Sequence, residues 1–517
     1  MAHSVSKLVV MVYPDTDLEM PGTYNLPLSV MAAVTCLYED YEIVIYDQRT
    51  DPLEKYVEAL ARHPIAVGIS TMTGSQLFNA IKLAKIAKDY GCTTIWGNWH
   101  PTLLPEQTLK HPCVDYVVTH EGEETMATLV RLLEREGEAE QKIWRGVITD
   151  WSIMPKVPYH LVDCNQYLFN AQYPHARVLP YTFSRGCPFQ CAYCATGNIF
   201  RKWEPQGVDR AVSNMMELVE TYNLDMIKFT DENISTNKKV FGPLAEAIGG
   251  RFGWLIQSRM DCLNRVDLDL LEKGGLRLVG AGLESGSNRI LKMIKKKETV
   301  EQYIDVNKKL ASTSIRSAYN FMMAFPGETW DDMMQTVDLG LRLLDDNPNA
   351  FLNPYYTFVP YPGCALSEQF EHLLPTSLED WATFDRFNAQ TPFSQKYQFE
   401  ISNIAFSSKY VGRRFVMKFP GNPKVEEFTD RLKWYWSRRD FGSDDWWDLR
   451  DENRDLMGEL FGEYAFDGVI ADRQKKAKSN HSLMKMAETK LPDGPQAPNA
   501  VTAEFKDGYV NTGASDY

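Results

Sequence analysis

Short apolar runs alternate with helical patterns from Lys7 to about Leu133, and this alternation restricts the fold more than any other feature of the sequence. Strands are expected at Leu8 to Val12, Glu42 to Tyr46, Ala66 to Ile69, Thr93 to Trp96 and Tyr116 to Val118. Helices are expected between them at Leu26 to Glu39, Leu53 to Arg62, Ser75 to Tyr90 and Glu123 to Glu134. Such alternation predicts a parallel, doubly wound α/β sheet, whose ligands bind beyond the carboxyl ends of the strands.

A second series of strands follows a linker marked by Pro155 and Pro158. These strands are expected at Met226 to Phe229, Trp254 to Gln257, Leu278 to Ala281, Ser317 to Met323 and Phe351 to Phe358. They predict a partial (β/α)6-type barrel, in which functional residues gather at the carboxyl ends of the strands. We expect a Rossmann-like domain over residues 1–150, a linker over 151–175 and the barrel over 176–372.

Residues 373–472 show helical periodicity and many aromatic side chains, as in Leu432 to Trp436 and Asp444 to Asp448. Aromatic residues at this density are typical of a helical domain that packs as a cap on a core, although they could also line a substrate pocket. Tyr355, Tyr356 and the turn at Tyr361 could line the same pocket. Residues 473–517 contain few apolar side chains, which predicts a tail that does not order itself.

Composition limits the classes of function. The chain has 517 residues and a net charge of −14, which disfavours nucleic acid as the main partner. The basic run at Lys295 to Lys297 is interpreted as a solvated helix face. No apolar stretch approaches the ~20 residues of a membrane span. Nine cysteines, scattered except for one triplet, and the lack of a secretory segment indicate a reducing cytoplasm.

The cysteine triplet follows the strand-like run from Val178 to Phe183 and consists of Cys187, Cys191 and Cys194. Three thiolates spaced in this way can hold three irons of a cubane cluster and leave the fourth iron open for a small molecule. Structural zinc is an alternative, but zinc needs a fourth ligand, and His175 lies at no recognisable finger spacing. The triplet therefore predicts a catalytic iron–sulfur cluster.

Polar motifs stand at the carboxyl ends of the barrel strands. They supply Asp231 and Glu232, Arg259, and Glu284 with Ser285. A ligand with an ammonium, a carboxylate and a ribose would find partners here, and S-adenosylmethionine (SAM) has all three. Arg259 could instead pair with Asp261. Glu328 and Thr329 could cap the next helix.

The first domain carries small, polar or glycine-rich loops at the corresponding ends of its strands. Their candidate ligand-binding residues are Pro14, Ser70, Thr71, Thr73, Gly97, Asn98, Trp99, His100, Glu121, Gly122 and Glu123. A large planar ligand could approach the backbone of such loops closely. No G-x-G-x-x-G or Walker motif is present in the sequence, so a nucleotide is not expected.

The stretch from Gly97 to Glu106, with Glu121 to Glu123, resembles the cobalamin-binding domain of B12-dependent radical SAM enzymes. The segments from Cys187 through Gly327 resemble the radical SAM superfamily. The resemblance implies cobalamin on the first-domain loops, a [4Fe-4S] cluster on the three cysteines, and SAM on the open iron. It also implies a SAM site made by Tyr193, Asp231, Glu232, Arg259, Glu284 and Ser285, with Asp231 or Glu232 facing the amine, Arg259 the carboxylate and Glu284 the ribose.

Two departures from that family pattern limit the comparison. Asn98 stands where family members usually have a second glycine, which leaves the backbone approach to the corrin open. The D-x-H-x-x-G signature of base-off cobalamin proteins is also absent, so His100 is not expected to ligate cobalt.

The resemblance implies an enzyme that methylates an unactivated carbon of a small-molecule or biosynthetic substrate through an adenosyl radical and methylcobalamin. An external electron donor of the flavodoxin or ferredoxin type is expected. Relatives that cyclise or rearrange rings without methyl transfer are the main alternative. A non-catalytic cobalamin- or zinc-binding protein is another.

A tRNA methylthiotransferase would place a second cluster on Cys36, Cys92 and Cys113. Cys36 falls in an expected helix, Cys92 at a helix end, and the chain is acidic, all of which disfavour that reading. Core packing is the preferred role of these three cysteines.

Overall fold

The computed structural model describes residues 7–16, 24–148, 150–168, 173, 175–384, 394 and 396–461. Contacts divide the chain into two units, Met1–Gly442 and Ser443–Tyr517. The described part of the second unit is residues 443–461, which contain helix α20 (Asp445–Phe461). The expected tail and the last residues of the expected helical region lie outside the described residues. Among those described, no helix is both long enough and apolar enough to cross a membrane.

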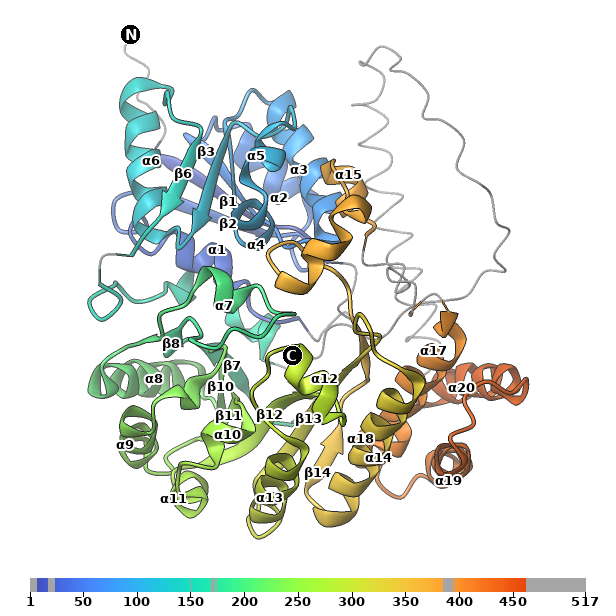
Figure 1. The fold of residues 1–517 in the computed structure, drawn as a ribbon. Coiled ribbons are helices and arrows are strands. Elements are labelled where there is room, and N and C mark those ends of the chain that lie inside the picture. Colours follow the sequence, from blue (N-terminus) through green and yellow to red (C-terminus); the bar gives the residue numbers. More distant parts are fainter. Residues whose placement is uncertain are drawn as a thin grey trace, which may run out of the picture. The chain divides into compact units, whose positions relative to one another are not determined.

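The first sheet has six parallel strands in the order β2-β1-β3-β4-β5-β6 (Figure 1). Its strands are β1 (Leu8–Tyr13), β2 (Glu42–Asp47), β3 (Ala66–Ser70), β4 (Thr94–Gly97), β5 (Tyr116–His120) and β6 (Ile143–Gly146). The helices are α1 (Leu28–Ala33), α2 (Leu53–Leu60), α3 (Gln76–Asp89), α4 (Trp99–Leu103), α5 (Pro105–Leu109) and α6 (Glu123–Glu136). The strand order reverses beside β1, so the loops after β1 and β3 open a crevice at the carboxyl edge.

The expected doubly wound sheet is confirmed, although α4 and α5 occupy the segment after β4, which was expected to be a loop. The helix expected over Leu26 to Glu39 ends at Ala33, because the chain continues in tight turns such as Thr35 N to Ala32 O. Cys36 therefore lies in a turn and not within a helix. Strand β6 lies at the edge of the sheet and was not expected.

The second sheet is the partial barrel, in the order β14-β13-β12-β11-β10-β7, with β15 paired to β13. Its strands are β7 (Val178–Tyr181), β10 (Met226–Phe229), β11 (Gly253–Gln257), β12 (Leu276–Glu284), β13 (Arg316–Met323), β14 (Ala350–Leu352) and β15 (Tyr356–Thr357). Around it lie α8 (Val208–Tyr222), α9 (Lys238–Ile248), α10 (Met260–Leu263), α11 (Leu268–Lys273), α12 (Asn288–Met293), α13 (Val300–Leu310) and α14 (Trp330–Asp346). The strand expected over Phe351 to Phe358 is divided into β14 and β15, with Pro354 in the gap.

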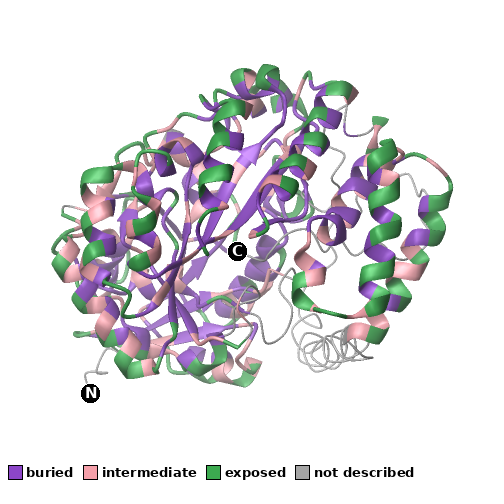
Figure 2. Ribbon diagram, turned by 90° about the horizontal axis from the view of Figure 1, so that it is seen from below, coloured by how far each residue is buried: buried purple, intermediate pink, exposed green. Residues whose placement is uncertain are grey.

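One apolar layer closes the amino-terminal end of the barrel. Each parallel strand contributes one buried residue to it, namely Val178, Met226, Leu255, Leu278, Ala318 and Phe351. Because side chains alternate along a strand, the next inward positions are two residues further on and include Lys228, Gln257, Gly280 and Asn320. The barrel interior is therefore apolar near the amino-terminal ends of the strands and polar nearer their carboxyl ends. Figure 2 shows the buried strands and the exposed outer faces of the helices.

The region after the barrel is helical where it is described, as expected. It contains η4 (Ala365–Leu373), α15 (Leu378–Trp381), α17 (Gln398–Val411), α18 (Arg414–Lys418) and α19 (Pro423–Arg438). Trp436 of α19 is buried, donates a hydrogen bond to Ser407 Oγ at 2.8 Å and packs edge-on against Tyr355. Tyr355 in turn stacks on Phe321 of the barrel. These aromatic side chains are core, and Tyr355 does not line an open pocket.

A buried ion pair fixes the end of β2. Arg49 donates to both carboxylate oxygens of Asp47, at 2.9 and 2.6 Å, and to the carbonyl of Asn25. The hydroxyl of Tyr167, from η2 (Cys164–Tyr167), donates to Asp47 Oδ2 at 2.9 Å. The guanidinium also lies 4.2 Å from the ring centre of Tyr13. This cluster ties the linker to the crevice edge of the first sheet.

We predict that Asp47→Ala lowers the free energy of unfolding by about 3 to 5 kcal/mol, because it leaves the Arg49 guanidinium buried without its carboxylate. Urea unfolding followed by tryptophan fluorescence measures the loss. Glu42→Ala is the matched control, since it removes the exposed partner of Arg62 and is expected to lose less than about 1 kcal/mol. Equal losses in the two variants would contradict the prediction.

Candidate active site

The cysteine triplet lies on a loop that turns back on the segment after it. The two-residue strands β8 (Ser184–Arg185) and β9 (Glu204–Pro205) pair in antiparallel fashion at its base. Gly186 has φ +79°, and a Cβ there would lie 2.1 Å from the carbonyl of Lys202, so this tight return needs glycine. Beyond it, Cys187 N donates to Phe200 O at 2.8 Å.

Contacts with the barrel fix the other end of this cysteine loop, which we define as residues 186–194. Ala192 N donates to Ile294 O at 2.8 Å, and Ala192 O accepts from Leu366 N at 2.9 Å. The thiol of Cys364 donates to the carbonyl of Tyr193 at 3.0 Å. The loop is thus held between the segment after α12 and the start of η4.

The donor set of the loop fits an iron–sulfur cluster. Cys191 is buried and Cys187 and Cys194 are half-buried. Burial raises the pKa of Cys187 to about 11, so a metal would displace a proton from this thiol. Among the described residues, no three His, Cys, Asp or Glu side chains surround a single metal-ion position. A cubane makes a different demand, because each thiolate binds its own iron.

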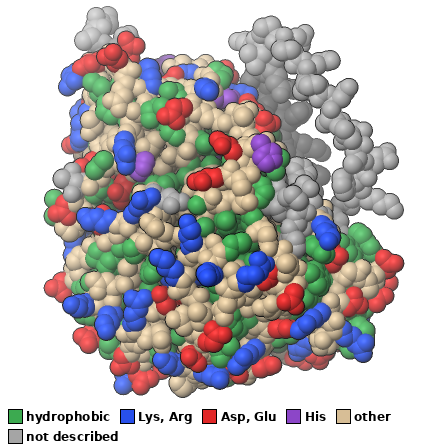
Figure 3. All heavy atoms as spheres, in the orientation of Figure 1, with side chains coloured by type: hydrophobic (Ala, Val, Ile, Leu, Met, Phe, Trp, Pro, Cys, Tyr) green, Lys and Arg blue, Asp and Glu red, His purple; other side chains and the backbone are tan. Residues whose placement is uncertain are grey.

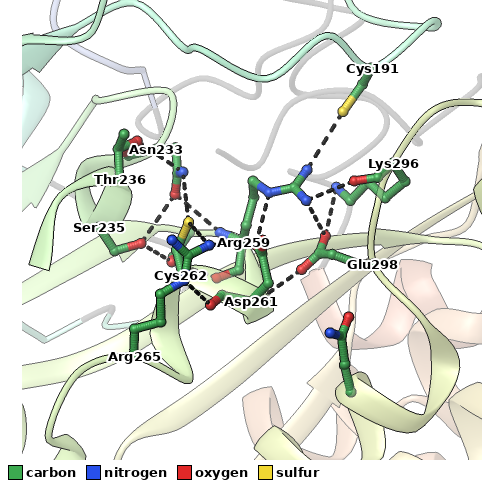
Figure 4. A network of polar contacts seen from close by, with 12 residues as sticks. Cys191, Asn233, Ser235, Thr236, Arg259, Asp261, Cys262, Arg265, Lys296 and Glu298 are labelled. Atoms are coloured by element: carbon green, nitrogen blue, oxygen red, sulfur yellow. Dashed lines mark hydrogen bonds and ion pairs between the residues drawn. The ribbon is translucent and has the colours of Figure 1, made fainter.

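Arg259 connects the loop to a buried set of charges, drawn in Figure 4. It follows β11, and its Nη1 lies 3.6 Å from Cys191 Sγ. Its Nε donates to Asp261 at 2.9 Å, and its Nη2 lies 3.4 Å from Glu298 Oε2. The alternative pairing with Asp261 is therefore present, and the same guanidinium also reaches the cysteine loop.

Glu284 and Lys296 form the second half of this set. Glu284 ends β12 with φ +67°, accepts from Tyr193 OH at 2.8 Å, and lies 3.3 Å from Lys296 Nζ. The same Nζ lies 3.7 Å from Glu298 Oε2. Burial alone would lower the pKa of Lys296, but Glu284 and Glu298 hold it above its usual value. The predicted residues Tyr193, Arg259 and Glu284 are thus brought together around Cys191.

The interpretation of residues 295–297 as a solvated face is wrong at its centre. Lys295 and Lys297 are exposed, whereas Lys296 is 4% exposed and Glu298 is 3% exposed. Sequence reasoning missed both buried residues. Lys295 and Lys297 have positive φ, at +55° and +58°, so this segment is not a regular strand, and no local pattern predicted which of its side chains would be buried.

The other predicted SAM residues have local hydrogen bonds. Asp231 is buried and accepts from Phe183 N at 3.0 Å and from the backbone and hydroxyl of Ser184. Burial raises its pKa to about 7, although these hydrogen bonds oppose the shift. Ser285 Oγ accepts from Ser287 N at 3.1 Å. Glu232 is exposed, so it is the more accessible carboxylate of its pair. Their SAM contacts stay predictions.

In the first domain, the loops after β3 and β4 hold each other. Ser70 Oγ lies 2.8 Å from Ser29 Oγ and accepts from Asn98 Nδ2 at 2.9 Å. Asn98 has φ +80° and ψ −157°, a backbone conformation that is otherwise almost confined to glycine and that strains an asparagine. Thr71 N donates to Gly97 O at 3.0 Å, and Pro14 O accepts from Gln76.

His100 is enclosed behind this edge. Its ring is buried, its Nδ1 lies 3.0 Å from Thr73 Oγ1, and Trp381 of α15 packs against it. Burial lowers the pKa of His100 to about 3, which keeps the ring neutral. The edge therefore presents hydroxyl and amide groups that fit the amide-bearing rim of a corrin. The enclosed ring of His100 does not fit the role of a ligand to cobalt.

The acidic residues after β5 contact Arg185, which precedes the cysteine loop. Arg185 pairs with Glu121 at 3.4 Å and more closely with Glu123, which is buried. Burial alone would lower the pKa of Arg185, but the two glutamates raise it. Trp99 and His120 pack edge-on against Phe200, with ring centres 5.6 and 6.0 Å away. Glu121 and Glu123 thus join the first domain to the barrel, and Gly122 lies between them at the start of α6.

The turn after β13 contains a buried glutamate. Glu328 accepts from Phe325 N at 3.1 Å through Oε2, while Oε1 has no hydrogen-bond partner among the described residues. Burial raises the pKa of Glu328 to about 8. Thr329, in contrast, caps α14 in a reciprocal capping box with Asp332. The capping role considered for both residues is confirmed for Thr329 and wrong for Glu328.

We predict that Lys296→Met lowers the free energy of unfolding by about 3 to 5 kcal/mol, because Glu284 and Glu298 lose their shared cation in a buried site. The double variant Lys296→Met/Glu298→Gln should recover part of the loss. Lys295→Met, at the exposed neighbouring position, should change stability by less than about 0.5 kcal/mol. Urea titration measures the free energy of unfolding of each variant. If Lys296→Met is as stable as Lys295→Met, the buried pairing of Lys296 with Glu284 and Glu298 is refuted.

We also predict a pH effect from Glu328. Its folded pKa of about 8 exceeds its unfolded value, so its stabilising effect is complete in acid and is lost as pH rises through 8. Glu328→Gln stays neutral and should flatten the fall in melting temperature between about pH 5 and pH 8.5. The exposed Glu368→Gln is the control. If the melting temperatures of wild type and Glu328→Gln change in parallel with pH, Glu328 is not protonated in the folded protein.

Two protein families match the chain. Residues 181–340, which run from the end of β7 into α14, match the radical SAM superfamily. Residues 22–130, which cover most of the first sheet, match the B12 binding domain. The match to the first family includes the cysteine loop and the charged set around Arg259, and the match to the second includes the edge loops around Ser70 and Asn98.

Similar proteins span both regions. An uncharacterized methyltransferase of Pyrococcus horikoshii is 27% identical over 442 residues, which are 79% of this chain and 94% of that protein. An anaerobic magnesium-protoporphyrin IX monomethyl ester cyclase of Rubrivivax gelatinosus is 25% identical over 362 residues, 64% of this chain and 61% of that protein.

The fold also has a solved counterpart. The structure of the cobalamin-dependent S-adenosylmethionine radical enzyme OxsB, with aqua-cobalamin and S-adenosylmethionine bound, matches with a TM-score of 0.63 at 14% identity. The match covers 94% of this chain and 81% of that chain, and at this identity it concerns the fold. Together with the two family matches, these observations place the chain in the radical SAM superfamily, among the members that carry a B12 binding domain ahead of the radical SAM domain.

Proposed function

We propose that this protein is a cobalamin-dependent radical SAM methyltransferase that methylates an unactivated carbon of a small molecule. The observation that carries the proposal is the contact between the two domains at Arg185 and Phe200, which flank the cysteine loop. Arg185 and Phe200 contact the carboxyl edge of the first sheet, and Arg259 contacts Cys191 from the barrel. A cluster on the cysteine loop and a corrin on the carboxyl edge of the first sheet would then face the same substrate.

The residues assigned to each cofactor follow from the donor groups present. Cys187, Cys191 and Cys194 would hold a [4Fe-4S] cluster, and the loops around Ser70, Thr73 and Asn98 would hold cobalamin. SAM would lie beside Tyr193, Arg259 and Glu284. When bound, these groups supply an adenosyl radical from SAM and a methyl group carried by cobalt.

The chain's own residues position and shield these groups. Lys296 fixes the carboxylate of Glu284, and Asp261 and Glu298 fix Arg259, so neither side chain is free to swing. The polar lumen at Lys228, Gln257 and Asn320 lies above a dry apolar layer and offers hydrogen-bonding groups to a substrate. Glycine at position 280 leaves room there, because a Cβ would meet Gln257 at 2.5 Å.

Methyl transfer is favoured over cyclisation because the Pyrococcus horikoshii methyltransferase is matched over 94% of its length, against 61% for the cyclase. We place the domains at residues 1–150, 176–372 and 373–472, with 151–175 as linker and 473–517 as tail. We assign the protein to the cytoplasm, where its nine free thiols stay reduced. It would draw electrons from a flavodoxin or ferredoxin.

Cofactor content tests the proposal without a substrate. Protein reconstituted anaerobically should hold about four irons per chain and show the visible absorption of a bound corrinoid. Cys191→Ala should lose the iron and keep the corrinoid, whereas Cys36→Ser should keep both. About eight irons per chain, or no corrinoid after reconstitution, would overturn this assignment.

Methyl-labelled SAM then separates the two reaction types. With reductant and candidate substrates, including magnesium-protoporphyrin IX monomethyl ester, we expect cluster-dependent formation of 5'-deoxyadenosine and the label in the product. Mass spectrometry measures both. Turnover that yields 5'-deoxyadenosine and an unlabelled, oxidised product would make the protein a cyclase or ring-rearranging enzyme.

A further inference from the structure

Four exposed cations surround the cysteine loop. Lys292 lies in the last turn of α12, Lys295 and Lys297 follow this helix, and Arg201 lies on the other side of the loop, after Phe200. All four side chains are exposed, and within the described part of the chain none takes part in a hydrogen bond or an ion pair. We call these four residues the basic rim.

Two neighbouring cations are paired with carboxylates, in contrast to the four residues of the basic rim. Lys202 pairs with Glu204, and Arg289 pairs with Asp332. The chain as a whole carries a net charge of −14, so a group of unpaired basic side chains is opposite in sign to the protein as a whole. Figure 3 shows Lys and Arg side chains gathered across the middle of this face, over the region where Figure 1 places α12 and the short helix α7 (Thr196–Ile199).

The basic rim is one residue away from the hydrogen bonds that hold the cysteine loop. Ile294, which precedes Lys295, accepts from Ala192 N at 2.8 Å. Phe200, which precedes Arg201, accepts from Cys187 N at 2.8 Å. Between them the loop turns Pro188 and Gln190 outward, and both are exposed. A protein seated on the rim would therefore touch the outer side of the loop that holds the cluster.

We propose that the basic rim is the docking surface for a small acidic protein that carries a one-electron redox centre. This inference rests on the proposed function and names the partner of its cluster. One electron leaves the reduced carrier and is taken up at the cluster on Cys187, Cys191 and Cys194, and no bond is made or broken in this transfer. Opposite charges steer such an encounter and orient it, and electron-transfer complexes commonly have small, transient interfaces.

Charge variants of the basic rim test this docking surface with an acidic flavodoxin as the probe. Lys295→Gln/Lys297→Gln removes two charges and Lys295→Glu/Lys297→Glu reverses them. Lys292→Glu/Arg201→Glu repeats the reversal at the other two positions, in case the first pair does not fold. The control is Lys273→Glu/Lys308→Glu, which makes the same change in net charge. Lys273 and Lys308 are exposed at the carboxyl ends of α11 and α13, at the end of the barrel opposite the loop.

Stopped-flow reduction by reduced flavodoxin, followed as bleaching of the cluster absorption, should be slowed about tenfold by each reversal at low salt and less by the glutamine variant. The difference should vanish at about 0.5 M salt, because screening shortens the range of exposed charges to a few ångströms. Calorimetric titration of oxidised flavodoxin into the iron-free protein should show the same order of affinities. The control should match wild type in every measurement.

Dithionite separates this inference from the proposed function, because a small reductant needs no docking surface. Rim variants that are reduced by dithionite at the wild-type rate and by flavodoxin more slowly support the docking surface. Unchanged flavodoxin rates and affinities in the charge reversals, or an equal loss in the Lys273→Glu/Lys308→Glu control, overturn it. A wild-type protein that dithionite cannot reduce overturns the proposed function itself, while the titration with iron-free protein still decides whether the rim binds flavodoxin.

Discussion

The hydrogen bond from Ala192 N to Ile294 O organises the candidate site. It joins the cysteine loop to the segment after α12, along which exposed and buried side chains alternate. Lys296 and Glu298 consequently reach the buried set around Arg259 and Glu284, and Lys295 and Lys297 reach solvent. One short segment thus supplies both the charge balance inside the site and the charge on its outer rim.

The acidic and basic groups of the first unit are divided between two tasks. At the join of the two domains, Glu121 and Glu123 neutralise Arg185, so the contact between sheet edge and cysteine loop is made by charge and by the aromatic contacts of Phe200. Inside the barrel mouth, Glu284 and Glu298 face Lys296 and Arg259. A buried charge is tolerated only with a partner, so each of these pairs also fixes the position of its members.

Much of the fold followed from local patterns in the sequence. Strand β10 coincides with its expected range, Met226–Phe229, and the sheets are parallel as the alternation with helices predicts. The cysteine loop, Arg259 and Glu284 were found because their motifs are short. The helix after Leu26 was overestimated because apolar periodicity continues through a run of turns, and the strand from Phe351 was not divided at Pro354.

The remaining site residues depend on contacts that no local pattern contains. The pairing of Glu123 with Arg185 joins residues far apart in the sequence, and the burial of Lys296 depends on the irregular path of the segment between two helices. His100 likewise became a neutral, enclosed ring through its contact with Trp381 of a distant helix. Tertiary packing decided these roles.

The apolar layer at the base of the barrel has a kinetic consequence. Val178, Met226, Leu255, Leu278, Ala318 and Phe351 fill one end of the barrel, so ligands do not enter from that end. A ligand that binds deep in the barrel has to enter before the ligand that covers it, and it can leave only after that ligand has left. We therefore expect an ordered mechanism, in which ligands bind and leave in an order set by how deep in the barrel each one lies.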